Sequence, residues 1–188
     1  MTIKRNVELL PFNKVKLVAT RKSWEHQLAS HADDVVASAY LRVLDWTEAH
    51  TDYTCENGNG IAYGIFESSH HAALAIVQIA YTKSGKKWLK VLDLDLSPAL
   101  DVAFFEDKLN FDQIGGIFAE AILGSIKLTK TAHPAKVTKL YGRSSSALAF
   151  FKGFGAAFEK FGGESGMDVS IEGRWLVFKA ATKTKDHV

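Results

Sequence analysis

The segment Lys139–Ala156, KLYGRSSSALAFFKGFGA, constrains the fold most, because a strand pattern, a polar turn and a helix pattern follow one another directly. Its first four residues fit a short buried strand. Ser144 or Ser145 is placed to cap the helix that follows, and Gly153 or Gly155 is placed to end it. The apolar residues of that helix recur at i, i+3, i+4 and i+7, which is the spacing of one helix face: Ala147, Phe150, Phe151 and Phe154.

Hydrophobic periodicity and turn residues predict the other elements, which together indicate one α/β domain over residues 1–181 and a polar, disordered tail over residues 182–188. The predicted strands are Val7–Phe12, Ile61–Glu67, Ala72–Thr82, Lys87–Leu96, Val137–Gly142, Ala157–Gly162 and Arg174–Ala181. The predicted helical segments are a turn or helix at Ser23–Ser30 and helices at Asp33–Ala49 and Asp112–Lys130. Loops are predicted at Thr51–Gly60 and, with a helical turn, at Ala99–Asn110.

The strand pattern at Lys87–Leu96 changes phase part-way along. Leu89 and Val91 are apolar at odd positions, whereas the later leucines are apolar at even positions. Because side chains alternate with a period of two, one extra residue is needed, and a β-bulge near Val91–Leu92 would supply it. The alternative is a strand whose first half is buried on both faces.

Composition limits the function classes. The 23 basic and 21 acidic residues give a net charge of +2, which argues against broad nucleic-acid binding but leaves room for a local basic patch. A single cysteine, Cys55, rules out an intrachain disulfide and favours a reducing compartment. No apolar run approaches the roughly 20 residues of a membrane span, and the first residues lack the features of a secretory signal. We therefore expect a cytoplasmic protein without membrane contact.

The sequence offers little for a metal. The adjacent His70 and His71 would point to opposite faces of a strand, so they do not suit one ion. Cys55 has no catalytic partner nearby in the sequence. We expect no metal site.

The unit at Lys139–Ala156 resembles the last strand–helix unit of the GNAT family of N-acetyltransferases, in which an N…A..FY…GF pattern packs beside the coenzyme A arm. The whole element order resembles that family over roughly residues 5–181, in topology more than in motif. The resemblance implies an acyl-CoA N-acyltransferase fold: a mixed, mostly antiparallel sheet flanked by helices and splayed at a bulged central strand. It also implies transfer of an acetyl group from acetyl-CoA to a primary amine by direct attack in a ternary complex.

The resemblance also implies where acetyl-CoA binds. Backbone groups freed at the bulge, at Leu92 and Leu94, would receive the pantetheine arm. The family's pyrophosphate loop, [QR]-x-x-G-x-[GA], corresponds to the segment that begins at Gln113 and contains Gly115 and Gly116, with Phe118 departing from the small residue at its last position. The turn residues Ser144 and Ser146 replace the asparagine that binds pantetheine amides. The lysines that could neutralise the adenosine 3′-phosphate are Lys127, Lys130 and Lys152.

The resemblance implies candidates for the general base, but the family's tyrosine acid is missing from this sequence. Asp93 and Asp95 lie beyond the bulge on the strand that often carries the family's general base, and the alternative for either is a solvated strand edge. Glu67 is a second candidate base. Phe151, which the resemblance also places among the cofactor-binding residues, replaces the family's tyrosine acid. Either the thiolate leaves without that acid, or another donor such as Tyr141 substitutes, or the protein is not a catalyst.

Two functional hypotheses follow. One is an N-acetyltransferase acting on an unidentified small-molecule or protein amine. The other is a degenerate member of the fold that serves as a binding or structural module, which Phe118 and Phe151 favour. A homodimer through the last strands stays open.

Overall fold

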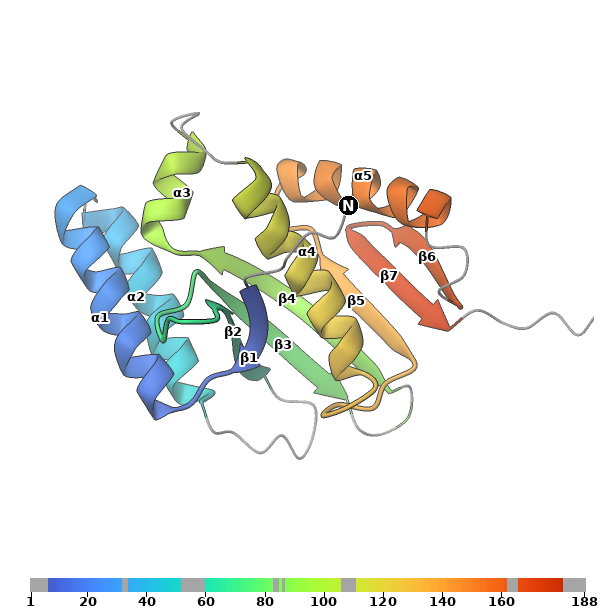
Figure 1. Ribbon diagram of the computed structural model, residues 1–188, viewed down its shortest axis with the longest axis horizontal. Coiled ribbons are helices and arrows are strands. Elements are labelled where there is room, and N and C mark those ends of the chain that lie inside the picture. The colour runs from blue at the N-terminus through green and yellow to red at the C-terminus, as the bar shows by residue number, and fades with distance from the viewer. Residues whose placement is uncertain are drawn as a thin grey trace, which may run out of the picture.

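The computed structural model describes residues 7–31, 34–51, 60–82, 85, 87–105, 111–161 and 166–180, and Figure 1 shows how their elements are arranged. The strands are β1 (Val7–Pro11), β2 (Gly60–Glu67), β3 (Ala75–Thr82), β4 (Trp88–Leu96), β5 (Val137–Tyr141), β6 (Met167–Glu172) and β7 (Trp175–Ala180). The helices are α1 (Lys14–His31), α2 (Asp34–Ala49), α3 (Pro98–Phe105), α4 (Phe111–Leu128) and α5 (Ser145–Phe161). The loop predicted at Thr51–Gly60 and the tail predicted at 182–188 lie largely or wholly outside these residues.

The strands form one open sheet in the order β1-β2-β3-β4-β5-β7-β6. All neighbours pair antiparallel except β4 and β5, which are parallel. The parallel pair requires a long crossover, and α3 and α4 lie within that connection. The result is a single α/β domain with a mixed, mostly antiparallel sheet, as the sequence predicts.

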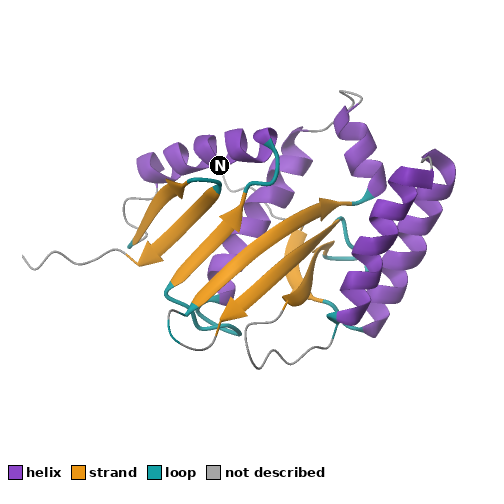
Figure 2. Cartoon of the chain, turned by 180° about the vertical axis from the view of Figure 1, so that it is seen from behind, coloured by secondary structure: helices purple, strands orange, loops and turns teal. Residues whose placement is uncertain are grey.

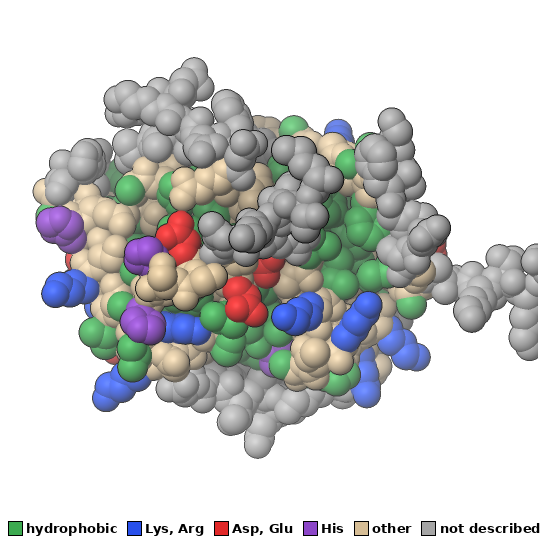
Figure 3. Space-filling view, in the orientation of Figure 1, with side chains coloured by type: hydrophobic (Ala, Val, Ile, Leu, Met, Phe, Trp, Pro, Cys, Tyr) green, Lys and Arg blue, Asp and Glu red, His purple; other side chains and the backbone are tan. Residues whose placement is uncertain are grey.

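Helices cover the two sheet faces unequally (Figures 1 and 2). α4 and α5 pack on one face, where the larger core cluster joins residues of β2–β5 and β7 to Ile117, Ile122 and Phe151. α1 and α2 pack on the other face, but only over β1–β3, around Trp24, Leu44 and Phe66. On the first face, Figure 3 shows hydrophobic side chains over the half that α5, β6 and β7 occupy in Figure 1.

The predicted β-bulge in β4 is confirmed. Gln78 of β3 is opposite Asp93, whereas the next residue, Ile79, is opposite Val91. Leu92 is therefore the extra residue and is 39% exposed, whereas Leu89 is fully buried and Leu94 packs against the larger core cluster. The bulge explains the phase change in the sequence, because each half of the strand keeps its own alternation.

The sheet splays directly after this bulge. The β4–β5 ladder covers only Trp88–Val91 and Val137–Leu140, while β4 continues beside β3 to Leu96 and β5 continues beside β7 to Tyr141. The edge of β4 that would face β5 is therefore unpaired with it from Leu92 onward. We call this region the splay.

The structure corrects two predictions about helices. One concerns α1 near the N-terminus, and the other concerns α3 in the connection between β4 and β5. The predicted turn or helix at Ser23–Ser30 is part of the much longer α1, which Asn13 caps by accepting a hydrogen bond from the Lys16 N–H at 2.9 Å. The predicted loop at Ala99–Asn110 begins with α3, whose first residue is Pro98, a position that needs no amide donor.

A further error concerns the end of α5. The predicted stop at Gly153 or Gly155 and the predicted strand at Ala157–Gly162 are wrong, because α5 continues to Phe161. Its apolar face continues too, since Phe154 and Phe158 both pack edge-on against Phe178 of β7, with ring centroids 6.3 and 5.6 Å apart. The sixth strand is instead β6, which pairs with β7 through a turn at Gly173, where φ is +63°.

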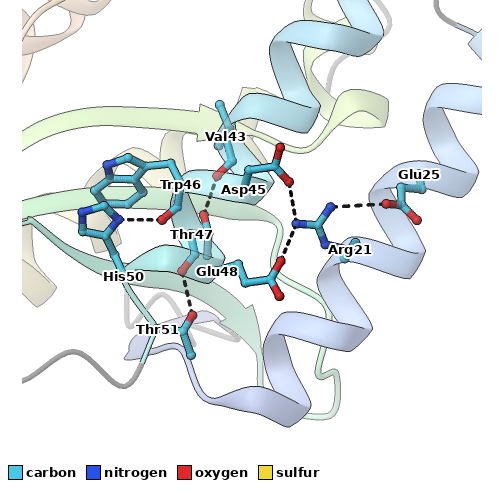
Figure 4. A network of polar contacts seen from close by, with 9 residues as sticks. All are labelled: Arg21, Glu25, Val43, Asp45, Trp46, Thr47, Glu48, His50 and Thr51. Atoms are coloured by element: carbon cyan, nitrogen blue, oxygen red, sulfur yellow. Dashed lines mark hydrogen bonds and ion pairs between the residues drawn. The ribbon is translucent and has the colours of Figure 1, made fainter.

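α1 and α2 are joined by charged contacts on their exposed sides (Figure 4). Arg21 of α1 lies 2.9 Å from Asp45 and 3.0 Å from Glu48 of α2, and 3.5 Å from Glu25 of its own helix. Such exposed pairs each contribute little, about 0–1 kcal/mol. The buried residues beneath them supply most of the cohesion between the two helices.

A glycine in α4 sets how closely that helix approaches β1. A Cβ added at Gly124 would lie 2.7 Å from Cβ of Leu9. We expect Gly124→Ala to lower the free energy of unfolding by roughly 1–3 kcal/mol, the usual cost of overpacking. Gly153→Ala in α5 is the matched control, because nothing lies within 4 Å of its added Cβ and helix propensity should raise stability by about 0.5–1 kcal/mol. Urea unfolding of both variants measures the difference, and equal stabilities would contradict the close approach.

Candidate active site

The splay brings together the strand ends that carry several candidate residues. Asp93 and Asp95 follow the bulge on β4, and Tyr141 ends β5. The ladder registers place all three on the sheet face that packs against α1 and α2, because Asp93 is opposite Gln78, Asp95 is opposite Ile76, and Tyr141 alternates with the core residue Leu140. The bulge determines this arrangement, since without it the two aspartates would point to the other face.

Asp95 is the most perturbed carboxyl group of the site. Burial and then the charge of Asp93 raise its pKa from 3.8 to about 6, although a hydrogen bond from Gln78 and the charge of Arg143 act in the opposite direction. The Gln78 side chain donates from Nε2 to Oδ2 of Asp95 at 3.2 Å. The group is therefore half-protonated close to pH 6, which suits a carboxylate that accepts a proton near neutral pH.

Asp93 is held as an ion pair. Arg143, from the turn between β5 and α5, donates from Nη1 to Oδ2 of Asp93, whose side chain is 16% exposed. Oδ1 of the same carboxylate accepts a hydrogen bond from the Leu94 N–H at 3.1 Å. Arg143 thus connects β5 to β4 across the splay, where the two strands no longer exchange backbone hydrogen bonds.

The turn that carries Arg143 is itself fixed by Arg174, which follows Gly173 in the β6–β7 turn. Arg174 donates from Nε to the Gly142 carbonyl at 2.9 Å and from Nη2 to the Arg143 carbonyl. Its own carbonyl accepts the Gly142 N–H at 2.8 Å. Sequence reasoning singled out this turn for its serines and missed both arginines, because nothing in the local pattern tells which acid a distant arginine will meet.

A second acidic group lies on the helical side of the site. Tyr40 of α2 donates its hydroxyl hydrogen bond to Oδ2 of Asp101 in α3. Burial, then Asp101 and more weakly Asp95, raise the pKa of Tyr40, so its hydroxyl stays protonated. Asp101 also raises the pKa of Asp95. The sequence analysis missed this contact because Asp101 falls in the segment that was predicted as a loop.

The candidate pyrophosphate residues lie in the first two turns of α4. Gln113 is the third helical residue and is half-buried. A Cβ added at Gly115 or Gly116 meets no described atom within 4 Å, so the neighbouring protein does not require glycine at either position. Lys127 lies at the other end of the same helix, roughly 20 Å from Gln113 at 1.5 Å per residue, and its ammonium is 3.8 Å from Oε1 of Glu8.

The serine turn supplies the N-cap of α5. Ser144 Oγ accepts a hydrogen bond from the Ala147 N–H at 3.0 Å, which confirms one of the two predicted caps. The hydroxyl keeps its own hydrogen for a second partner. Ser146 lies in the first turn of α5, and its side chain is outside the described part of the structure.

Aromatic residues fill the space between α4 and α5. Phe151 is 4% exposed and belongs to the core beneath α5. Phe118 of α4 instead contacts Phe150 of α5, with ring centroids 5.0 Å apart. Tyr141 stays at the surface, 36% exposed, with its ring centroid 4.9 Å from that of Trp175.

The remaining candidates lie apart from the aspartates. Glu67 ends β2, and its Oε2 is 3.1 Å from Nδ1 of His70. Among the residues described, no group of three or more His, Cys, Asp and Glu side chains has a metal-binding arrangement. Within the same ranges, no helix combines the length and apolarity of a membrane span.

Comparisons with known proteins give structural similarities only. No protein-family model matches the sequence, and no curated protein matches it. A GNAT family acetyltransferase from Brucella melitensis, crystallised in complex with acetyl-CoA, is similar over 96% of this chain and 92% of its own, at 11% identity and a TM-score of 0.44. One from Elizabethkingia anophelis, with acetyl-CoA bound, is similar over 95% of this chain and 100% of its own, at 11% identity and a TM-score of 0.40. The fold assignment rests on this chain's own strand order, bulge and splay.

Proposed function

We propose that this protein transfers an acetyl group from acetyl-CoA to a primary amine. The observation that carries the proposal is the splay beside the β4 bulge, with the carboxyl group of Asp95 on the bordering strand and a pKa of about 6. An unpaired strand edge offers backbone groups to an extended arm, and a carboxyl group that titrates near neutrality offers a base. The acetyl-CoA-bound structures named above agree with this reading of the fold.

The residues present fit acetyl-CoA as the co-substrate. The β4 edge at Leu92 and Leu94 would bind the pantetheine arm, and the turn at Ser144 and Ser146 lies on the opposite side of the splay. The first turn of α4 directs backbone N–H groups outward, as an anion site needs, and the open space beside Gly115 and Gly116 leaves room for phosphate. Acetyl-CoA supplies the thioester carbon to which the amine nitrogen adds.

The carboxylates would remove a proton from the amine substrate. Asp95, ionised above pH 6, accepts the proton that the incoming ammonium must lose before its nitrogen can attack. Asp93, paired with Arg143, keeps Asp95 basic through its negative charge. As the new C–N bond forms, the C–S bond breaks, and Tyr141 is the proposed donor of the proton that the departing thiolate takes up.

A binding or structural module is the second candidate. The contact of Phe118 with Phe150 places two rings between the helices that flank the splay, and Phe151 provides no proton to a leaving group. In that case the fold would persist without acetyl transfer. Binding of acetyl-CoA separates the two candidates at the first step.

A thermal-shift series with glycine variants tests the proposal. Millimolar acetyl-CoA should raise the melting temperature, Tm, of the wild-type protein, because a ligand of the native state stabilises it. Gly116→Ala should raise Tm without ligand, since helix propensity favours alanine by about 0.5–1 kcal/mol, but should lose most of the acetyl-CoA-induced shift. Gly153→Ala is the control, because it should gain the same stability and keep the full shift.

Two results would count against the proposal. The absence of any shift in the wild-type protein would favour the module without a cofactor. An unchanged shift in Gly116→Ala would show that acetyl-CoA binds elsewhere than at the start of α4.

A further inference from the structure

The sheet face that packs against α1 and α2 is only partly covered by them. Over the other half of this face, no helix lies among the described residues. α1 and α2 cover this face only at β1–β3, and Figure 2 shows the remaining strands lying in front of α4 and α5. We call the side chains of β4, β5, β7 and β6 on this side the open face. Its members follow from the pairing registers, which align Lys90 with Lys139 and Tyr141 with Trp175.

Three aromatic rings lie on the open face. Trp88 and Trp175 are half-buried, and Tyr141 is exposed. Tyr141 and Trp175 are cross-strand partners with ring centroids 4.9 Å apart. Aromatic side chains that stay partly in water on a sheet surface provide flat surfaces on which another planar group can stack.

Cations alternate with these rings. The Lys90 ammonium lies 4.9 Å from the ring centroid of Trp88 and 5.9 Å from that of Trp175. The Lys139 ammonium lies 4.8 Å from the Trp88 ring, and the Arg174 guanidinium lies 5.7 Å from the Tyr141 ring. Each ring therefore has a positive charge beside it.

A cavity of about 740 Å³ continues this surface at the end of the sheet away from the splay. Four lysines line it, against a single acidic residue, Glu172; they are Lys87, Lys136, Lys139 and Lys179. Glu172 contacts Lys139 at 3.0 Å and Lys179 at 2.6 Å, so it neutralises only part of this charge. The cavity lining is therefore positively charged, although the same sheet face also carries Asp168 on β6 and the two aspartates of β4 near the splay.

We propose that the open face binds single-stranded nucleic acid, with bases stacked on Trp88 and Trp175 and backbone phosphates near Lys90 and the cavity lysines. Alternating flat rings and fixed cations match a polymer that alternates bases and phosphates. The cavity volume is within the range that accommodates a small organic ligand such as a nucleotide. This proposal does not depend on acetyl transfer, because it gives no role to Asp93 or Asp95. The two sites share one sheet face, however, since Trp175 pairs with Tyr141 at the splay end of that face.

Other occupants fit the charges less well. A second copy of the chain packed through the same face would bring lysines against lysines. The segment after Ala180 has two lysines and one aspartate, so its charge has the same sign as the surface. An acidic peptide would satisfy the lysines but would leave the three rings without stacking partners.

Fluorescence anisotropy with a labelled oligothymidylate of about ten nucleotides tests the proposal, since such a length fills one typical single-strand site. We expect binding that quenches tryptophan fluorescence and weakens as salt rises. Trp88→Leu combined with Trp175→Leu should weaken binding about tenfold or more, while Trp88→Phe should retain most of it. Lys90→Gln should reduce the salt dependence, and Lys22→Gln on exposed α1 should not.

Three outcomes would overturn the proposal. One is the absence of binding at about 100 μM protein in low salt, where even non-specific complexes form. Another is binding of duplex DNA as tight as that of the single strand and unaffected by the tryptophan changes. The third is binding of polyglutamate at equal strength, which would identify an acidic protein surface as the partner. Circular dichroism of each variant excludes unfolding as the cause.

Discussion

Asp95→Asn is expected to lower kcat for acetyl transfer by about 10²–10⁴-fold, the usual contribution of a general base. Asparagine keeps the size of the side chain and an oxygen that accepts the Gln78 hydrogen bond, but it cannot take a proton. The Tm rise caused by acetyl-CoA should remain, because the Asp95 side chain is not part of the proposed acetyl-CoA-binding site. Initial rates with a panel of primary amines, combined with thermal shifts, provide the two readouts.

The pH dependence of the wild-type rate gives an independent check. Because the ionised form of Asp95 is the base, kcat/KM should rise as pH increases through about 6, the pKa of this group. Arg143→Gln should move this midpoint to higher pH, since the charge of Arg143 lowers the pKa of Asp95. Asp93→Asn should move it to lower pH, because the negative charge of Asp93 raises that pKa. If Asp95→Asn lost cofactor binding but kept its turnover at saturation, the assignment of the base would fail.

The same pKa has a consequence for stability. A carboxyl group whose pKa is higher in the folded protein stabilises it at low pH, and this contribution is lost as pH rises from about 4 to above 6. Ionised Asp95 therefore destabilises the protein at pH 7.5. The destabilisation is at most roughly 3 kcal/mol, because each change of one in pKa between the unfolded and folded states corresponds to about 1.36 kcal/mol. Asp95→Asn should accordingly melt no lower than the wild type at pH 7.5.

Trp24→Ala is expected to cause the largest loss of stability, about 3–5 kcal/mol, as for other buried aromatic side chains. Trp24 is fully buried, and its Nε1–H donates to the Ala73 carbonyl at 2.9 Å. It also packs edge-on against Tyr40, with ring centroids 5.9 Å apart. For a domain of this size the change corresponds to a Tm that is lower by about 10 °C or more.

Trp24→Phe separates the two contributions of the tryptophan. It keeps much of the ring packing but removes the donor, so that the Ala73 carbonyl loses its partner. We expect it to cost clearly less than Trp24→Ala. Calorimetric melting of both variants measures the difference. Equal, small losses in both would show that α1 contributes little to the fold.

Much of the sheet was predictable because it depends on local periods. The phase change between Val91 and Leu92 is visible in the sequence, and it locates the bulge that creates the splay. The apolar spacing at Ala147–Phe154 likewise locates α5. Alternation and helical spacing are properties of neighbouring residues, so a single sequence records them directly.

The errors arose where tertiary contacts override local signals. Glycines at 153 and 155 suggested a helix end, but the ring packing of Phe158 on Phe178 keeps α5 helical beyond them. α1 was underestimated because exposed valines, Val15 and Val18, interrupt its apolar face. Intrinsic preferences are small compared with the burial of such aromatic residues.

In the candidate site, too, local sequence signals were readable and long-range contacts were not. Asp93 and Asp95 were identified because their strand position is local information. Their partners were not, since Arg143 is 50 residues from Asp93. The contact between Tyr40 and Asp101 spans 61 residues. Pairings at such separations are fixed by the topology of the sheet and leave no periodic signal.

The open sheet terminates at β1 and β6, and each edge carries features that hinder the addition of a foreign strand. β1 has the charged Glu8 as its second residue and ends at Pro11, which lacks an amide hydrogen. β6 presents Asp168 and Glu172 on one side, so that two copies meeting antiparallel about Ser170 would oppose carboxylates. Joining copies by extending the sheet is therefore disfavoured at both margins, which protects the chain against fibrous aggregation.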